Sequence, residues 1–328
     1  MEQVKISVIG TGHLGSIHAK LWKNTPGAEL VGIYDIDAER AAKIAAEQGC
    51  QPFNSLDEVI KNSDAVTIAA PTSEHFAIAK QCIVGGCHCL IEKPITAEYS
   101  EARELIDLAR RHERLVQVGH VERFNPAIAA IRDFGLDPLF IEAHRLSQFK
   151  PRAIDVSVIH DLMIHDIDIM LWMIKSPVKN IDANGVALLT DAVDIANARI
   201  TFENGAVANL TASRISANPM RKMRLFQRNA YISIDFGERN VEVFHLVEEG
   251  EEANGHGIPA AMLGTLDAGS KNKSIYYQKP EIPESNAIAD EQAAFVEAIA
   301  QGTPVPVGAA EAAEALRIAG EINSMIKI

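Results

Sequence analysis

Long hydrophobic runs and basic clusters are both scarce in this chain of 328 residues. No window approaches the roughly 18 uninterrupted apolar residues that a membrane-spanning helix needs. The 44 acidic residues outnumber the 31 basic ones, so the formal charge is 31 − 44 = −13, and the basic residues form no long run. Because nucleic acids and anionic membranes attract clustered positive charge, we expect neither as a partner.

Cysteine is also rare, with four residues in the whole chain. Cys82, Cys87 and Cys89 lie around His88, a grouping that could suggest zinc. A Gly-Gly pair interrupts the segment, however, and the paired C-x2–4-C spacing of zinc sites is missing, so buried thiols are the preferred interpretation and a metal site is the alternative. The chain begins MEQVKISVIG, without the basic segment and cleavage site of a secretion signal. We therefore expect a cytoplasmic protein in a reducing compartment.

The most informative part of the N-terminal half runs from an apolar strand at residue 5 to Asp35. The strand enters a G-x-G-x-x-G motif, a helix follows at once, and a second apolar strand ends in the carboxylate. Gly10 permits the tight turn, Gly12 lets the backbone approach a pyrophosphate, and Gly15 lets helix and strand pack closely. Free amides of the first helical turn would face the phosphates. The pattern predicts a dinucleotide site, with a structural turn as the alternative.

Asp35 lies about 20 residues beyond the last glycine, where a carboxylate accepts hydrogen bonds from the adenosine ribose. NAD is therefore favoured over NADP, because a carboxylate would repel the 2′-phosphate, although the nearby Arg40 leaves NADP open. The other expected cofactor contacts lie in the glycine turn and in two later loops: His13, Leu14, Pro71, Thr72, His75 and Glu92.

Apolar runs alternate with helical segments as far as residue 118, which predicts a parallel, doubly wound sheet. Successive strands then dominate to residue 247, and Glu203-Asn204-Gly205 is a strong hairpin signal. The chain thus predicts an α/β protein with a Rossmann domain at 1–122 and an α/β domain at 123–328 built on a large, mostly antiparallel open sheet. Residues 248–272 lack periodicity and are predicted to form a variable loop.

Two groups of polar residues could carry chemistry. Lys93 follows an apolar strand and precedes Pro94, at the rim where ligands of such sheets bind, and Glu92 could hold its charge. An ordinary salt bridge at the rim is the alternative. Farther on, Asp161, His165 and Asp168 recur at helical spacing in a helix that is otherwise apolar. Buried carboxylates and a histidine need partners, either a ligand or one another.

The segment that leaves the sixth predicted strand, Gly119-His-Val-Glu-Arg-Phe-Asn-Pro126, supplies Arg123 and Asn125 as candidate substrate contacts. Arg123 could instead only connect the two domains. The second domain lacks an evident basic cluster for a diphosphate. The basic residues that could assemble one are Arg123, Arg145, Lys150 and Arg152.

In this order and spacing, the glycine motif, Glu92-Lys93-Pro94, the Gly119–Pro126 segment and Asp161-x-x-x-His165 resemble the glucose-fructose oxidoreductase/inositol dehydrogenase/MocA family. The resemblance covers essentially the whole chain. It implies reversible oxidation of a sugar or cyclitol hydroxyl by a nicotinamide, and an open sheet often used for oligomerisation. It also implies that Lys93, Asp161 and His165 match the family's catalytic lysine and D-x-x-x-H pair, and it extends more weakly to members that act on UDP-linked amino sugars.

The predicted function is thus an oxidoreductase that transfers hydride from a secondary hydroxyl of a sugar, nucleotide-sugar or cyclitol to NAD. In that reaction a base must take the hydroxyl proton, for which His165 is best suited, and Lys93 would stabilise the alkoxide. Asp168 could bind substrate or pin its helix. The alternatives are an NAD-recycling lyase or hydrolase that acts through a transient keto-sugar and a non-catalytic regulator that binds the cofactor. A homodimer or homotetramer formed through the C-terminal sheet is expected.

Overall fold

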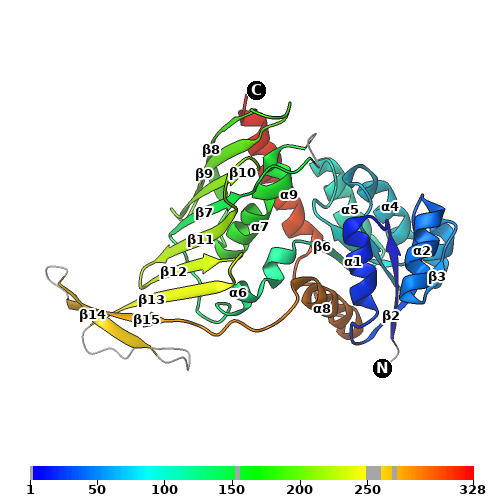
Figure 1. The fold of residues 1–328 in the computed structure, drawn as a ribbon, viewed down its shortest axis with the longest axis horizontal. Coiled ribbons are helices and arrows are strands. Elements are labelled where there is room, and N and C mark those ends of the chain that lie inside the picture. Colours follow the sequence, from blue (N-terminus) through cyan, green and yellow to red (C-terminus); the bar gives the residue numbers. More distant parts are fainter. Residues whose placement is uncertain (1–2, 152–155, 249–259, 268–271) are drawn as a thin grey trace. The chain divides into compact units, whose positions relative to one another are not determined.

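A computed structural model describes residues 3–151, 156–248, 260–267 and 272–328 (Figure 1). The chain forms two compact units. The first comprises Met1–Phe124 and Ser285–Arg317, and the second comprises Asn125–Glu284 and Ile318–Ile328. The division expected near residue 122 lies close to the first crossing between the units. The return of the chain to the first unit was not anticipated from the sequence.

The first unit is built on a parallel sheet whose strands follow the order β3-β2-β1-β4-β5-β6 (Figure 1). This is the strand order of a dinucleotide-binding fold, in which the two halves meet between β1 and β4. The carboxyl ends of the parallel strands share one edge, so the turns that follow β1, β2, β4 and β5 lie along a single rim. The strands are β1 (Val4–Ile9), β2 (Ala28–Tyr34), β3 (Gln51–Pro52), β4 (Ala65–Ile68), β5 (His88–Glu92) and β6 (Val116–Gly119).

The helices of this unit begin and end where local chemistry predicts. Asp37 caps the second helix by accepting a hydrogen bond from the Arg40 amide at 3.0 Å, and Gly49 ends it with a φ of 78°. Ser55 caps the third helix through the Glu58 amide at 3.2 Å. The connecting helices are α1 (His13–Trp22), α2 (Ala38–Gln48), α3 (Leu56–Asn62), α4 (Thr72–Val84) and α5 (Tyr99–Arg111).

The segment that returns from the C-terminal part of the chain completes both apolar cores of the first unit. Helix α8 (Ala287–Gln301) contributes Phe295 and Val296 to the cluster that contains Trp22 of α1. Helix α9 (Ala309–Met325) contributes Leu316 to the opposite cluster, with side chains of α4 and α5. Residues 285–317 therefore stabilise both faces of the parallel sheet.

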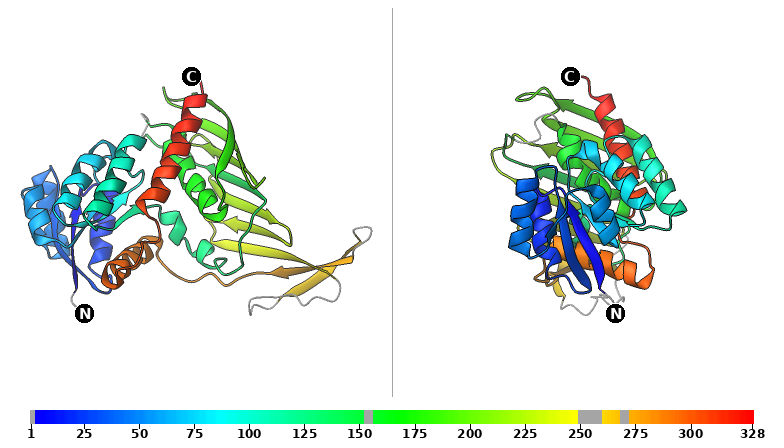
Figure 2. Two further views of the ribbon diagram at one scale, coloured as in Figure 1. Left: turned by 180° about the vertical axis from the view of Figure 1, so that it is seen from behind. Right: turned by 90° about the vertical axis from the view of Figure 1, so that its right-hand side faces the viewer.

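The second unit contains a large sheet, seen from two further sides in Figure 2. Its strands follow the order β14-β15-β13-β12-β11-β7-β10-β9-β8 (Figure 1). Only the pairing of β7 with β10 is parallel among the strands described in this sheet. The predicted hairpin at Asn204-Gly205 is confirmed between β9 and β10, where Gly205 has a φ of 85°. The strands are β7 (Phe140–Leu146), β8 (Val178–Val186), β9 (Ile195–Phe202), β10 (Val207–Ser213), β11 (Met220–Gln227), β12 (Ala230–Asp235), β13 (Asn240–Glu248), β14 (Ala261–Asp267) and β15 (Asn272–Gln278).

The predicted variable loop at 248–272 is wrong for residues 261–267, which form β14 and pair with β15. Residues 249–259 and 268–271 lie outside the described part of the chain. The pairing of β14 with β15 is irregular between Met262 and Gly264. This irregularity breaks the alternation of apolar and polar residues, which is the signal that identifies a strand in a sequence.

Helices cover one face of the second unit's sheet. Helix α7 (Ile164–Met173) contacts β7 and β10, and it follows a π-helical turn, η2 (Ile159–Met163) (Figure 1). The predicted helix from Asn125 to Asp133 is shorter than expected, since α6 spans Pro126–Ala129. The 3-10 helix η1 (Val121–Phe124) precedes it in the first unit.

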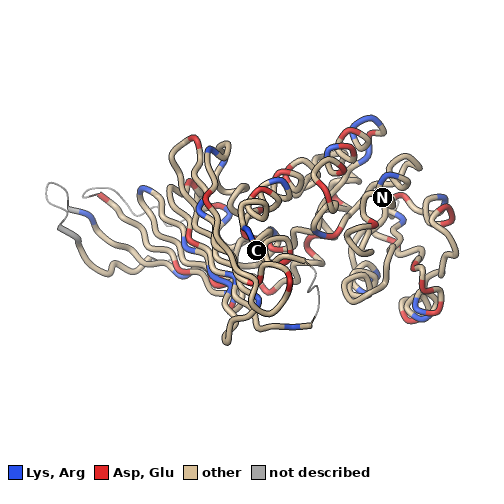
Figure 3. Tube along the Cα trace, turned by 90° about the horizontal axis from the view of Figure 1, so that it is seen from above, with Lys and Arg blue, Asp and Glu red and all other residues tan. Residues whose placement is uncertain are grey.

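Acidic and basic residues are interspersed along the trace of each unit, in keeping with the absence of a long basic run in the sequence (Figure 3). Within the described ranges, every helix is too short or too polar to cross a bilayer. Cys82, Cys87 and Cys89 are buried, as predicted, and burial raises the pKa of the Cys87 thiol to about 11. The described residues contain no group of three side chains arranged to hold a metal ion.

Candidate functional site

The glycine turn after β1 is packed so closely that two of its glycines cannot carry a side chain. A Cβ on Gly10 would lie 2.7 Å from the Ala70 amide nitrogen, and Gly10 has a φ of 83°. A Cβ on Gly15 would lie 1.9 Å from the Gly10 carbonyl oxygen. At Gly12, by contrast, a Cβ would meet no heavy atom of the described residues within 4 Å. This open side of Gly12 fits the close approach of a pyrophosphate to the backbone.

Helix α1 begins directly after Gly12, which has no side chain to bond the first helical amides. These amides carry the positive end of the helix dipole and are suited to a phosphate. His13 and Leu14, both predicted cofactor contacts, are exposed in this first turn. A cavity of about 540 Å³ lies between α1 and α2 and is lined by residues that include Gly12, His13 and Arg40.

Asp35, at the end of β2, is bound to the glycine turn. Its Oδ2 accepts hydrogen bonds from the Thr11 amide at 2.6 Å and the Thr11 hydroxyl at 2.9 Å. Its Oδ1 accepts from the Asp37 amide at 2.9 Å and from Arg40 Nη2 at 3.0 Å. Burial raises the pKa of Asp35, but these hydrogen bonds outweigh burial and lower it. The carboxylate is therefore charged, and its hydrogen bonds to Thr11 position the glycine turn.

His75 supports the same rim from behind. Its ring is buried, with Nδ1 2.9 Å from the Pro94 carbonyl oxygen and Nε2 2.9 Å from the Ala70 carbonyl oxygen. Both nitrogens thus contact backbone, and the imidazole joins the end of β4 to the turn after β5. The structure places this ring inside the unit, whereas Pro71 is exposed and Thr72 is half-buried at the start of α4.

Glu92, at the end of β5, holds the backbone of the residue that follows it. Its Oε1 is 2.7 Å from His18 Nε2, and its Oε2 accepts a hydrogen bond from the Lys93 amide at 3.2 Å. Burial raises the pKa of Glu92, but the hydrogen bond from His18, the positive charge of Lys93 and the hydrogen bond from the Lys93 amide lower it overall. A Cβ on Gly119 would lie 3.0 Å from Glu92 Oε2, so the glycine leaves room for this carboxylate. Lys93 itself is half-buried.

Arg123 and Asn125 are the candidate substrate contacts. Arg123 lies near the end of the first segment of the first unit, and Asn125 is the first residue of the second unit. Arg123 belongs to η1 and is 6% exposed. Asn125 caps α6, and its Oδ1 accepts a hydrogen bond from the Ala127 amide at 3.0 Å. The structure thus gives Asn125 a clear local role in starting a helix.

The predicted polar helix of the second unit is only partly regular. Asp161 lies in the π-helical turn η2, and His165 lies in the first turn of α7; both side chains are half-buried. Asp168 is 1% exposed. The prediction of a continuous α-helix from Asp161 is wrong for its first turn. A π-turn inside a helix is energetically poor and occurs frequently at functional sites.

A buried ion pair joins α7 to the sheet. Arg145 Nε and Nη2 each lie 2.9 Å from a carboxylate oxygen of Asp166, and both side chains are nearly inaccessible. Bidentate pairing of this kind fixes the guanidinium in direction as well as in place. Arg145 is therefore committed to Asp166, which argues against its predicted membership of a diphosphate cluster. Lys150 is exposed, and Arg152 lies outside the described residues.

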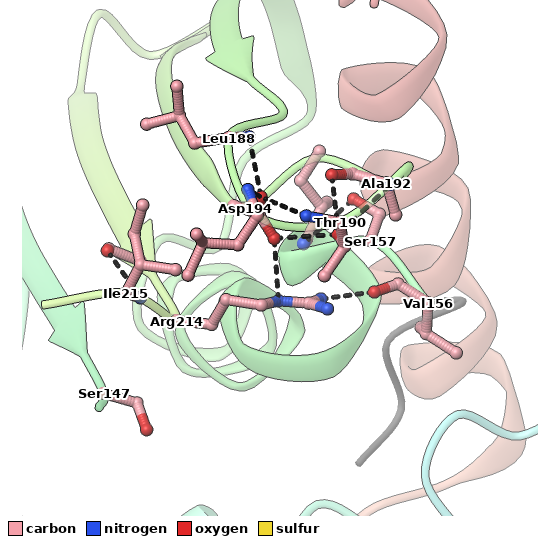
Figure 4. A network of polar contacts seen from close by, with 12 residues as sticks. Ser147, Val156, Ser157, Leu188, Thr190, Ala192, Asp194, Arg214 and Ile215 are labelled. Carbon is pink, nitrogen blue, oxygen red and sulfur yellow. Dashed lines mark hydrogen bonds and ion pairs between the residues drawn. The ribbon is translucent and has the colours of Figure 1, made fainter. Parts of the chain in front are cut away.

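The turn before β9 is organised around Asp194, which is fully buried (Figure 4). Its Oδ2 accepts hydrogen bonds from the Leu188, Leu189 and Thr190 amides at 2.7, 2.6 and 3.0 Å. Arg214 Nε lies 3.9 Å from Asp194 Oδ1, and Arg214 Nη2 donates a hydrogen bond to the Val156 carbonyl oxygen. Burial raises the pKa of Asp194, but the backbone amides lower it to about 2.

This network reaches the segment that leads into η2. The Val158 amide donates to the Val193 carbonyl at 2.9 Å, and the Asp161 amide donates to the Ser157 carbonyl at 3.0 Å. The backbone that carries Asp161 is thus tied to the turn around Asp194. No local sequence pattern predicts this connection, because the residues that form it lie far apart along the chain.

Two family models match the chain. The model of an oxidoreductase family with an NAD-binding Rossmann fold covers residues 4–120, and the model of the GFO/IDH/MocA C-terminal domain covers residues 126–233. The chain belongs to the Gfo/Idh/MocA oxidoreductase family. The glycine turn, the open side of Gly12 and the order of the six strands agree with the NAD-binding half of this family.

Relatives with established names include a UDP-N-acetylglucosamine 3-dehydrogenase from Acidithiobacillus ferrooxidans. It is 40% identical over 306 residues, which cover 93% of this chain and 91% of the relative. A solved structure of the dehydrogenase of that name from the same organism superposes with a TM-score of 0.88 and 36% identity, and covers 99% of this chain and 98% of the other.

A second group of relatives is named for cyclitols. The NAD-dependent scyllo-inositol 2-dehydrogenase of Bacillus subtilis is 30% identical over 235 residues, or 65% of this chain and 68% of the relative. A scyllo-inositol dehydrogenase from Lactobacillus casei, solved with NAD(H) and scyllo-inositol, shares the fold at a TM-score of 0.76 and 19% identity, with 99% and 97% of the two chains covered.

Proposed function

We propose that this enzyme is an NAD-dependent dehydrogenase of UDP-N-acetylglucosamine that oxidises the 3-hydroxyl of the amino sugar. The observation that carries the proposal is the 40% identity to the dehydrogenase of that name, which extends over 93% of the chain and includes both units. The inositol dehydrogenases match at 30% identity over smaller shares of the chain, so the nucleotide-sugar activity is the better supported one.

In this reaction NAD, when bound, accepts the hydride from the sugar carbon. We propose that His165 is the base that takes the proton from the hydroxyl, because the ordinary pKa of histidine is closest to neutrality among the available side chains. Asp161, in the preceding turn, orients His165 or binds a neighbouring hydroxyl. Lys93 stabilises the negative charge that develops on the oxygen. The half-buried positions of Lys93, Asp161 and His165 support these roles, since each side chain is sheltered and still reachable.

The remaining assignments are supporting ones. The turn at Gly10–Gly15 and the exposed His13 and Leu14 hold the pyrophosphate side of NAD, and Asp35 faces the adenosine ribose. Pro71 and Thr72 line the nicotinamide side, while His75 and Glu92 hold the loops behind it. The proposed substrate contacts are Arg123, Asn125 and Asp168. The low exposure of Arg123 and Asp168 favours a positioning contribution from these two.

A cyclitol dehydrogenase is the second candidate, and one observation favours it. A UDP-sugar carries a diphosphate, yet Arg145 of the expected basic cluster is bound to Asp166 and buried. A neutral cyclitol would need no such cluster. A measurement of which substrate the enzyme oxidises therefore has to decide between the two activities.

The deciding experiment offers the enzyme a panel of substrates and monitors each reaction by the absorbance of the reduced nicotinamide. UDP-N-acetylglucosamine, UDP-glucose, free N-acetylglucosamine, myo-inositol and scyllo-inositol are each offered with NAD and with NADP. We expect the fastest reduction with UDP-N-acetylglucosamine and NAD, with the 3-keto product identified by mass spectrometry. Faster turnover of an inositol would replace the proposal by the second candidate, and a tightly co-purified NAD without net reduction would support the recycling lyase.

The catalytic assignment is tested by Lys93→Met and His165→Asn. Each variant should lower kcat by roughly 100-fold or more, because it removes a group that acts on the reacting oxygen. The affinity for NAD, measured by fluorescence titration, should stay nearly unchanged. Lys80→Met is the matched control, since Lys80 is an exposed lysine paired with Glu104 on the surface. Turnover like that of the wild type in either variant would remove its residue from the mechanism.

We further propose that the open face of the second unit's sheet binds a second copy of the chain. Half-exposed aromatic side chains run across five strands of this face, with ring centroids 5.0 to 5.9 Å apart between neighbours. The row consists of Phe140, Phe226, Tyr231, Phe244 and Tyr277. A continuous apolar patch of this kind typically marks a protein interface. Sedimentation of wild type and Phe226→Glu should give an oligomer and a smaller species; a wild-type monomer at micromolar concentration would rule the interface out.

A further inference from the structure

The carboxylate of Glu92 lies at the centre of a buried polar network in the first unit. His18 and the Lys93 amide occupy its two oxygens. Charged or titratable groups that act on it electrostatically include His18, Lys93, His75 and Glu291. The position of the Lys93 backbone thus depends on how this carboxylate is held.

The proton on His18 can be assigned from its neighbours. Gln292 of α8 is fully buried, and its side-chain nitrogen lies 3.1 Å from the His18 carbonyl oxygen and 3.1 Å from His18 Nδ1. A carbonyl oxygen only accepts, so this end of the Gln292 amide must be the nitrogen, and its second hydrogen points to Nδ1. The Gln292 oxygen, in turn, accepts from the Thr25 hydroxyl at 3.1 Å.

It follows that Nδ1 of His18 presents a lone pair and that the imidazole proton is on Nε2. The Nε2–H then donates to Glu92 Oε1 across 2.7 Å. The hydrogen bonds of Gln292 leave His18 no other arrangement in which every polar contact is favourable. An imidazolium would place an N–H of His18 against an N–H of Gln292.

We propose that Gln292 is a positioning residue for Lys93: its amide holds His18 as the neutral Nε2–H tautomer, and His18 thereby fixes the Glu92 carboxylate that receives the Lys93 amide. Gln292 touches neither cofactor nor substrate in this role and acts through two other side chains. The inference rests on the proposed catalytic role of Lys93 for its effect on turnover, whereas the tautomer itself follows from the hydrogen bonds alone.

Two further observations support a relay that begins on α8. Glu291, the neighbour of Gln292, is 1% exposed, and its backbone carbonyl accepts a hydrogen bond from the side chain of Gln117 at 2.9 Å. Gln117 lies on β6, next to β5. The helix is therefore held to β6 through the Glu291 carbonyl and to α1 through Gln292, which provides a rigid support for a precise hydrogen bond.

The direct test is the protonation state of His18 in the wild-type protein. The chain has 11 histidines, so long-range proton–nitrogen correlation spectra of protein labelled with 15N-histidine are compared with those of His18→Gln to assign the signals of His18. We expect a protonated Nε2 and an unprotonated Nδ1 at neutral pH. An Nδ1–H tautomer or an imidazolium would overturn the proposal, and neither result depends on turnover.

Gln292→Glu tests the cause. A carboxylate at this position attracts a proton to Nδ1, so His18 should become doubly protonated, while Gln301→Glu, an exposed change on the same helix, should leave its signals unchanged. We expect a kcat roughly tenfold lower in Gln292→Glu, with an NAD dissociation constant within about twofold of wild type. An unchanged His18 spectrum or an unchanged kcat would contradict the relay.

A pair of variants at position 18 separates positioning from simple packing. The amide of a glutamine can place a donor where Nε2 lies, so His18→Gln should retain much more activity than His18→Leu, which has no donor for Glu92. Equal losses in the two variants would mean that only the bulk of His18 matters. If wild type oxidises no sugar of the panel, the proposed function fails while the spectra still decide the tautomer.

Discussion

At the scale of single residues, Glu291 is the most unusual ionisable group in the first unit. Its carboxyl oxygens are buried and have no hydrogen-bond partner among the described residues. Burial, and then the negative charge of Glu92, raise the pKa of Glu291 well above its ordinary value. A carboxyl group in this setting keeps its proton in the folded protein and loses it in the unfolded chain.

Glu291→Gln should therefore stabilise the first unit at neutral and alkaline pH. A raised pKa in the folded state gives stability that is complete below the unfolded pKa of about 4.3 and is lost as the pH rises toward the folded value. In wild type the loss approaches about 1.4 kcal/mol per pH unit, and the uncharged amide of the variant removes it. Urea unfolding between pH 5 and pH 8 measures the difference.

Glu297→Gln is the control for this prediction, because Glu297 is exposed on the same helix. It should leave the pH dependence of unfolding as it is in wild type. If the free energy of unfolding depends on pH in the same way for wild type and Glu291→Gln, Glu291 is ionised in the folded protein.

At the scale of elements, the turn at Leu188–Thr190 depends on one carboxylate. Its three amides point at Asp194, which has a pKa of about 2 and lies near Arg214. Asp194→Asn should lower the free energy of unfolding by about 2 kcal/mol at pH 7, since it removes the charge that these donors stabilise.

The effect should depend on pH in a defined way. A lowered folded pKa gives stability that is present above the unfolded pKa of about 3.9 and is lost as the pH falls toward 2. The difference between Asp194→Asn and wild type should thus shrink below pH 4 in denaturant titrations. Asp191→Asn, an exposed change in the same turn, should be neutral at every pH. A constant difference down to pH 2.5 would mean that packing, and not charge, accounts for the loss.

Elements with strong local signals were the ones that could be predicted. Gly15 is required by its contact with the nearby Gly10 carbonyl, and Ser55 and Gly49 bound their helices through adjacent amides. The π-turn at Asp161 could not be predicted, because the residue before it, Val158, donates a hydrogen bond to the carbonyl of Val193, which is distant in the sequence. Gln292 was missed for the same reason, since its partner His18 is separated from it by most of the chain.

At the scale of the whole molecule, the first unit is assembled from two distant stretches of sequence. A chain that ends at residue 284 would lack α8 and α9 and would expose the apolar side chains that pack against them. We expect such a truncation to unfold the first unit, seen as a red shift of Trp22 fluorescence in a Trp172→Phe background. Removal of 326–328 alone, beyond the end of α9, is the control and should cause no shift. Native-like emission from the chain of 284 residues would contradict this account of the core.

The same return of the chain sets the order of events during synthesis. A ribosome completes residue 124 long before residue 317, a gap of 317 − 124 = 193 residues. At about 5–20 residues per second, this gap lasts roughly 10–40 s. Until α8 has been made, its side chains cannot cover Trp22, and the first unit lacks residues that complete its core. The part of the protein that is made first therefore stays incomplete until nearly the end of synthesis and has to be kept from aggregating during that time.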